Sequence, residues 1–86
     1  MTHGHLRRLL TDLNFLIPRI PAPRLKLICS ALHIIIIAGV KNSGVRVESG
    51  QEAIDILDAV AKNRMPQKEA LRDLQTLQKG EANDST

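Results

Sequence analysis

Residues 27–40 read LICSALHIIIIAGV, and the conformation of this stretch decides the fold. The stretch is apolar at nearly every position. A helix formed by it would present apolar side chains on almost every side, so other helices would have to cover it. In such a helix Lys26, Ser30, His33 and Lys41 align as a thin polar stripe, which Ile37 interrupts.

The same stretch also permits a β-hairpin. Residues 34–37 are consecutive isoleucines, and β-branched residues favour strands. A loop over residues 41–44 would join them to a second strand at residues 45–47. A two-stranded unit this short is weak without a helix layer or a second subunit. We therefore favour the helix and keep a hairpin at about residues 34–47 as the alternative.

The segment before this stretch has the pattern of an amphipathic helix. Residues 6–17 place Leu or Ile at i, i+3, i+4, i+7, i+10 and i+11, which is the spacing of one helical face. Pro18, Pro21 and Pro23 should end this helix near Ile17, because proline lacks an amide donor and biases the preceding residue away from helix. The fixed φ of Pro23 then suits the first turn of a second helix.

Two further helices are predicted towards the C-terminus. Ser49 and Glu52 form an S-x-x-E capping box, which predicts a helix start, and Pro66 ends or restarts that helix. Asp58 and Lys62 have the i, i+4 spacing of an exposed ion pair. The last helix is expected over about residues 67–79, with leucines at three-residue spacing: Leu71, Leu74 and Leu77.

These elements predict an all-α fold, a small bundle of three to four helices around one strongly apolar helix. The alternative is an α+β fold that contains the hairpin. We expect residues 1–80 to form a single helical domain and residues 81–86 a disordered C-terminal tail. A second helix over residues 22–41 would be about 30 Å long, more than the first helix could cover. Some apolar surface should therefore remain for a partner or a second copy of the chain.

The composition excludes several classes of protein. A chain of 86 residues is too short for a catalytic barrel or a doubly wound nucleotide-binding sheet. One Phe and no Tyr or Trp disfavour recognition of single-stranded nucleic acid by stacking. The single cysteine, Cys29, permits no internal disulfide, which favours a cytoplasmic location. Residues 27–40 also fall short of the roughly 20 apolar residues that a membrane-spanning helix needs, so we expect no membrane partner.

Charge is distributed unevenly along the chain. Residues 1–48 carry seven Lys or Arg and two acidic residues, a net charge of +5. Residues 49–86 carry five Lys or Arg and seven acidic residues, a net charge of −2. This polarity suits head-to-tail association, or an anionic partner for the basic half.

Few residues suggest a metal-binding or catalytic site. Cys29 and His33 would share a helical face, as would Ser30 and His33, but no second ligand pair and no acidic partner stand at a fixed spacing from them. A buried thiol beside a hydrogen-bonded histidine explains the first pair more simply. We therefore expect a non-enzymatic protein with no metal, no cofactor and no catalytic residue.

The remaining class of function is binding. We predict a small helical protein-interaction module, such as a regulator, adaptor or assembly factor, that forms a homo-oligomer or binds a protein partner through the apolar helix. The predicted interface residues are Leu27, Ile28, Leu32, Ile35, Ile36, Leu71, Leu74 and Leu77. The alternative is a basic nucleic-acid-binding protein, a DNA-binding regulator, whose phosphate contacts are Arg7, Arg8, Arg24 and Lys26.

Overall fold

The computed structural model describes residues 3–40 and 42–79. They form four α-helices and one 3₁₀-helix: α1 (His3–Leu16), η1 (Ile17–Arg19), α2 (Leu25–Ala38), α3 (Ser49–Ala61) and α4 (Gln67–Lys79). The all-α prediction is confirmed. The alternative hairpin at residues 34–47 is wrong, because residues 34–38 continue α2 and no strand occurs in the described ranges. The predicted C-terminal tail lies outside the described residues.

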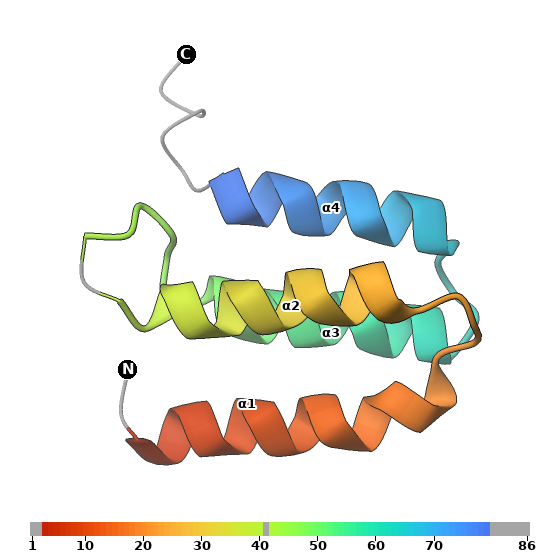
Figure 1. Cartoon of the computed structure of the whole chain (residues 1–86), viewed down its shortest axis with the longest axis horizontal. Helices are drawn as coiled ribbons and strands as arrows, with labels where there is room; N and C mark the ends of the chain where they lie inside the picture. The colour runs from red at the N-terminus through yellow and green to blue at the C-terminus, as the bar shows by residue number, and fades with distance from the viewer. Residues whose placement is uncertain (1–2, 41, 80–86) are drawn as a thin grey trace.

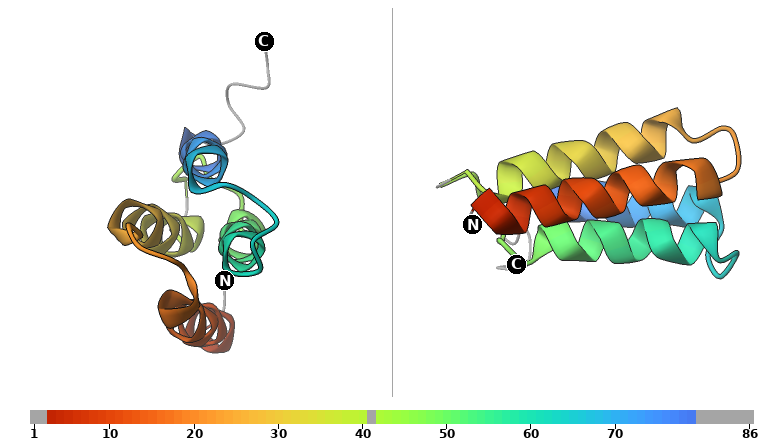
Figure 2. Two further views of the ribbon diagram at one scale, coloured as in Figure 1. Left: turned by 90° about the vertical axis from the view of Figure 1, so that its right-hand side faces the viewer. Right: turned by 90° about the horizontal axis from the view of Figure 1, so that it is seen from below.

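The four helices form a flat bundle with α2 and α3 in the middle and α1 and α4 at two opposite edges (Figures 1 and 2). Both α2 and α3 pack against all three other helices. The bundle measures 34 × 33 × 18 Å along its principal axes, and Figure 1 looks down the shortest one, with α2 in front of α3. It therefore has two broad faces, which we call the α2 face and the α3 face.

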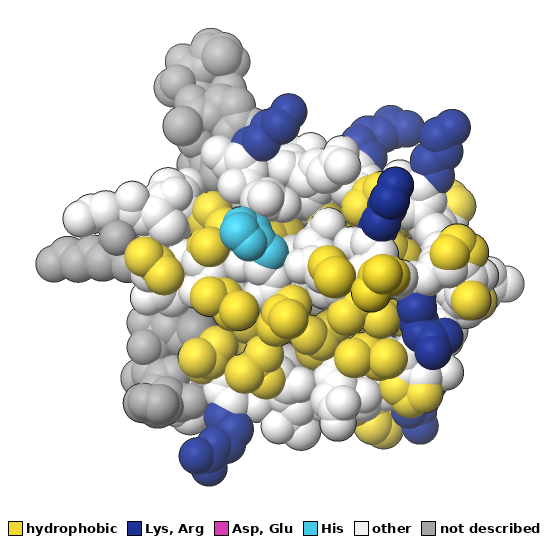
Figure 3. Space-filling view, viewed as in Figure 1, with side chains coloured by type: hydrophobic (Ala, Val, Ile, Leu, Met, Phe, Trp, Pro, Cys, Tyr) yellow, Lys and Arg dark blue, Asp and Glu magenta, His cyan; other side chains and the backbone are white. Residues whose placement is uncertain are grey.

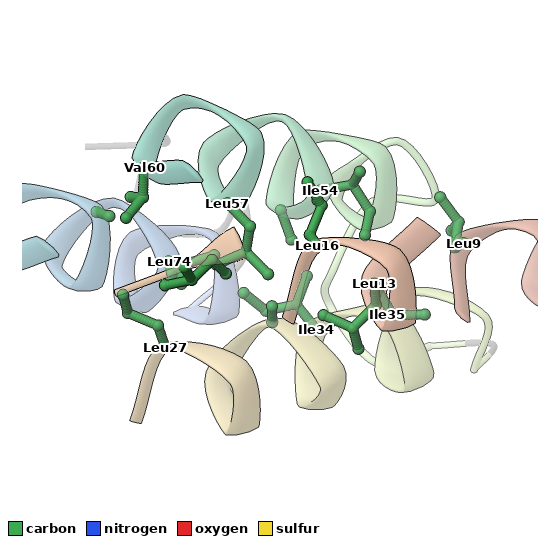
Figure 4. Packing of buried hydrophobic residues seen from close by; sticks show 14 residues of the cluster. Leu9, Leu13, Leu16, Leu27, Ile34, Ile35, Ile54, Leu57, Val60 and Leu74 are labelled. Carbon is green, nitrogen blue, oxygen red and sulfur yellow. The ribbon is translucent and has the colours of Figure 1, made fainter. Parts of the chain in front are cut away.

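The hydrophobic core lies between α2 and α3 and extends to the inner sides of α1 and α4 (Figure 4). Burying one Leu or Ile side chain contributes about 1.5–3 kcal/mol, so a core of this size dominates the stability. The edge helix α4 buries only Ala70 and Leu74. The largest fully buried apolar side chains are Leu9, Ile20, Ile34, Ile35, Leu57 and Leu74.

The proline-rich link between α1 and α2 is part of the packed structure. Helix α1 ends at Leu16, close to the predicted end, and Pro18 lies in the 3₁₀ turn η1. Ile20 follows in an extended conformation, with only 1% of its side chain exposed. This isoleucine anchors the link in the core.

Helix α2 is shorter than the span 22–41 that the sequence suggested. It begins at Leu25, with Arg24 at the N-cap, so Pro23 precedes the helix and does not occupy its first turn. It ends at Ala38, and Gly39 is the C-cap residue. The loop that follows contains left-handed backbone at Asn42 and Gly44, with φ of 66° and 84°.

The start of α3 agrees with the sequence, but the predicted capping box does not form. The helix begins at Ser49, and Glu48 occupies the N-cap position without a side-chain capping bond. Ser49 is only 2% exposed, in the first turn. The Glu52 carboxylate accepts two hydrogen bonds from Nη2 of Arg46, at 2.9 and 3.1 Å. This ion pair, and no capping box, ties the preceding loop to α3.

Two side-chain contacts involve α3 and the start of α4. The predicted pair forms, because Nζ of Lys62 lies 3.0 Å from Oδ2 of Asp58. Nε2 of Gln67 donates a hydrogen bond to the carbonyl oxygen of Pro21 at 2.7 Å, which joins the start of α4 to the proline-rich link.

Candidate interaction surface

The outer side of α2 is an apolar strip. Since successive helical residues are about 100° apart, residues spaced by three or four positions share one side. Leu25, Ile28, Leu32 and Ile36 have this spacing along the outer side. Leu25 is 73% exposed and Ile36 is 52% exposed, whereas Ile28 and Leu32 are half-buried. The most hydrophobic helix of the chain thus presents large side chains to solvent as well as to the core.

Figure 3 shows the α2 face as a space-filling surface. Hydrophobic side chains form a continuous band across its middle, over α2 and towards α1. Lys and Arg side chains lie around the margin of the band, and no Asp or Glu side chain of the described residues is visible on this face. We call this surface the apolar band. Contiguous apolar patches with a polar margin mark protein or membrane contact sites.

A groove of about 560 Å³ opens between the first turns of α2 and α4, at one end of the apolar band. Its apolar wall includes Pro23, Leu25 and Leu71, and its charged residues are Lys26 and Lys68. Neither lysine has an ion-pair partner in residues 3–40 and 42–79. The groove can therefore accept an apolar group that carries negative charge beside it.

The predicted interface residues divide into two sets. Leu27, Ile35 and Leu74 are 3%, 0% and 0% exposed, so these three side chains belong to the core of the chain itself and are not available to a partner. The others reach the surface in part or fully: Ile28, Leu32, Ile36, Leu71 and Leu77.

The leucine row of α4 does not lie on one face. A three-residue step on a helix falls about 60° short of a full turn, so the row winds around α4. Leu71 lines the groove beside α2, Leu74 points into the core, and Leu77 lines a groove beside α3. The row therefore contributes to both faces of the bundle.

The four predicted phosphate contacts do not form one patch. Arg7 and Arg8 are exposed near the start of α1, whereas Arg24 and Lys26 lie at the start of α2. The two helices run in opposite directions, so the two pairs lie towards opposite ends of the bundle (Figure 1). Arg24 also donates a hydrogen bond from Nη1 to the carbonyl oxygen of Ile20, at 3.2 Å.

The residues considered as metal ligands or catalytic groups lie on the outer surface. Cys29 is exposed, not buried as its apolar neighbours suggested, and His33 is exposed one turn further along α2. Within the described ranges no group of three or more His, Cys, Asp or Glu side chains could hold a metal ion. No helix of the part that the structure describes is long and apolar enough to span a membrane.

The acidic residues that gather on the α3 face were not predicted from the sequence. A groove of about 360 Å³ between α3 and α4 is lined by Glu52, Asp55 and Asp73 together with Ile56 and Leu77. A second groove of about 210 Å³ lies between α1 and α3. Asp12, Asp55, Asp58 and Phe15 are among its lining residues. The spacing of Asp55 and Asp58 in the sequence indicated that these two carboxylates lie on one side of a helix. Nothing in the sequence indicated that Asp12 of α1 and Asp73 of α4 would line the same grooves.

Comparison with protein-family models found no match, and comparisons with curated proteins and with solved structures found none either. The function of the chain must therefore be argued from its own surface.

Proposed function

We propose that this chain is a small protein-interaction module that self-associates through the α2 face. In this proposal it acts by binding and not by catalysis, in the cytoplasm, as a regulator, adaptor or assembly factor. The observation that carries the proposal is the apolar band on α2 (Figure 3).

The free energy of removing exposed apolar surface from water supports this proposal. Leu25, Ile36 and Val40 leave 73%, 52% and 53% of their surface in contact with water, and all three belong to α2 or directly follow it. Removing such area from water is favourable by roughly 25 cal/mol per Å². A second copy that covers the band would gain this free energy.

The dimensions of the molecule also support association. The two longer axes of the bundle measure 34 and 33 Å. The α2 face is therefore large enough for a standard interface, which buries roughly 800 Å² per partner. A bundle only 18 Å thick has few residues between its two faces, so stacking a second copy is an effective way to enlarge the buried core.

The test is light scattering on a size-exclusion column, with far-ultraviolet circular dichroism to check the fold. We expect the wild-type chain to elute at a whole multiple of 9.5 kDa. Ile36→Asp should reduce the mass to 9.5 kDa with unchanged helix content, because a charge would be buried in the interface. Val47→Asp is the matched control, since Val47 is 45% exposed in the α2–α3 loop, and it should retain the wild-type mass.

Two outcomes would overturn the proposal. One is a wild-type mass of 9.5 kDa at every concentration tested. The other is an absorbance band near about 260 nm that travels with the protein and disappears at high salt, which would identify bound nucleic acid. The chain has one Phe and no Tyr or Trp, so its own absorbance hardly interferes with this band.

A further inference from the structure

The two broad faces of the bundle differ in charge. The α2 face carries the apolar band and its margin of Lys and Arg, with no acidic side chain of the described residues in view (Figure 3). Five of the seven acidic residues in the described ranges line the grooves beside α3, on the opposite face. These five are Asp12, Glu52, Asp55, Asp58 and Asp73. Arg46 and Lys62 pair with Glu52 and Asp58, so the carboxylates without an ion-pair partner in the described ranges are Asp12, Asp55 and Asp73.

From this asymmetry we infer that self-association is head to tail: the α2 face of one copy binds the α3 face of the next. This inference rests on the proposed function and adds the identity of the second surface. Each copy then uses two different surfaces, so the assembly is a closed ring if the rotation between copies closes and an open filament if it does not.

The two surfaces combine a ridge on one side with a groove on the other. The outer side of α2 is a helical ridge with Leu25 and Ile36 exposed, and the α3 face has a groove of about 360 Å³ between α3 and α4. Ile56 and Leu77 are the two apolar residues that line this groove, and its other lining residues are polar or acidic. A helix with its apolar side laid in such a groove is a common mode of protein recognition.

Unpaired charges favour the same arrangement. Lys26 and Lys68 border the ridge, and Asp55 and Asp73 line the groove. Within the described ranges, Lys26, Lys68 and Asp73 have no ion-pair partner in their own copy. Head-to-tail contact places lysines opposite carboxylates.

The alternative symmetric dimer, with α2 faces in contact, is disfavoured by the same charges. It would place the basic margins of both copies around one apolar contact, where like charges across the interface repel each other. Asp55 and Asp73 on the α3 face would then gain no basic partner from a second copy.

The experiment uses two full-length variants with one face impaired in each. Ile36→Asp impairs the α2 face and leaves the α3 face intact, while the double variant Asp55→Lys/Asp73→Lys impairs the α3 face and leaves the α2 face intact. Head-to-tail binding predicts that each variant alone has a mass of 9.5 kDa. An equimolar mixture should then form a heterodimer of twice that mass, because each variant supplies the surface that the other lacks.

A charge exchange provides a second measurement. Lys26→Glu/Lys68→Glu alone should lose assembly, and a chain that combines it with Asp55→Lys/Asp73→Lys should regain it. Circular dichroism checks that each variant is folded.

The outcomes separate this inference from the proposed function. If wild-type chain is monomeric, self-association itself is excluded. If wild-type chain assembles and Asp55→Lys/Asp73→Lys keeps the wild-type mass, the α3 face is not used and only the head-to-tail inference fails. A mixture of folded variants that remains monomeric would also overturn it.

Discussion

The four consecutive isoleucines differ in burial, although they are neighbours in the sequence. Ile34 and Ile35 are 0% exposed, while Ile36 is 52% exposed and Ile37 is half-buried. The side chains are identical, so hydrophobicity does not distinguish them. Their roles follow from the rotation of about 100° per residue along the helix.

This placement predicts different costs for the same substitution at neighbouring positions. Ile35→Ala should lower the free energy of unfolding by about 2–5 kcal/mol, because it leaves a cavity in the core. Ile36→Ala should change it by no more than about 0.5 kcal/mol, as for other surface positions. Urea denaturation followed by circular dichroism measures both, at high dilution so that assembly does not contribute. Equal losses would contradict the inward and outward placement.

At the scale of the element, α4 has the fewest buried residues of the four α-helices, counted over their described side chains. Ala70 and Leu74 are its only buried residues. Its first residue, Gln67, bonds to the carbonyl oxygen of Pro21 at 2.7 Å, so a polar contact helps hold the helix against the proline-rich link. The same region forms the groove between α2 and α4.

We predict that Gln67→Ala lowers the free energy of unfolding by about 0.5–1.5 kcal/mol, the usual contribution of one hydrogen bond. Gln78→Ala is the matched control in the same helix, because the Gln78 side chain is exposed and makes no hydrogen bond within the described residues. It should leave the stability unchanged. Thermal or urea unfolding of both variants provides the comparison, and an equal effect of the two would show that the bond to Pro21 contributes nothing.

At the scale of the whole molecule, the flat shape separates two surfaces that a rounder bundle would merge. Placing α2 and α3 in the middle leaves each of them with one covered and one open side (Figure 2). The open side of α2 is apolar with a basic margin, and acidic residues gather beside α3. This arrangement of the helices is the basis of the head-to-tail contact that we infer.

Head-to-tail assembly should consequently weaken with salt. The screening length falls from about 10 Å at 0.1 M salt to about 3 Å at 1 M, which reduces attraction between lysines and carboxylates across the interface. We expect the mass measured by light scattering to decrease towards 9.5 kDa as sodium chloride is raised over this range. A mass that stays constant or increases would instead indicate contact between α2 faces, whose basic margins repel each other less at high salt.

Local patterns in the sequence were enough to predict the helices. The end of α1 near Ile17 was predicted from apolar spacing and proline, and the span of α4 from Pro66 and its leucines. The start of α3 at Ser49 was predicted from the S-x-x-E pattern, although the capping bonds themselves do not form. These signals act within one or two helical turns, so they can be recognised without knowledge of the fold. Contacts between distant residues were not predictable in this way. Gln67, for example, binds a carbonyl oxygen 46 positions away. Even a local pattern did not give the partner of Glu52, which binds Arg46, six positions earlier, and not the helix start.

The candidate surface needed the packed structure. The apolar helix was recognised in the sequence, but which of its side chains would face solvent depended on where α1, α3 and α4 covered it. That arrangement buries Leu27 and Ile35 and exposes Leu25 and Ile36. Likewise, the acidic grooves combine residues from three helices. Local periodicity places a side chain on one side of its own helix, whereas burial depends on which other helices pack there, and only the folded chain brings those helices together.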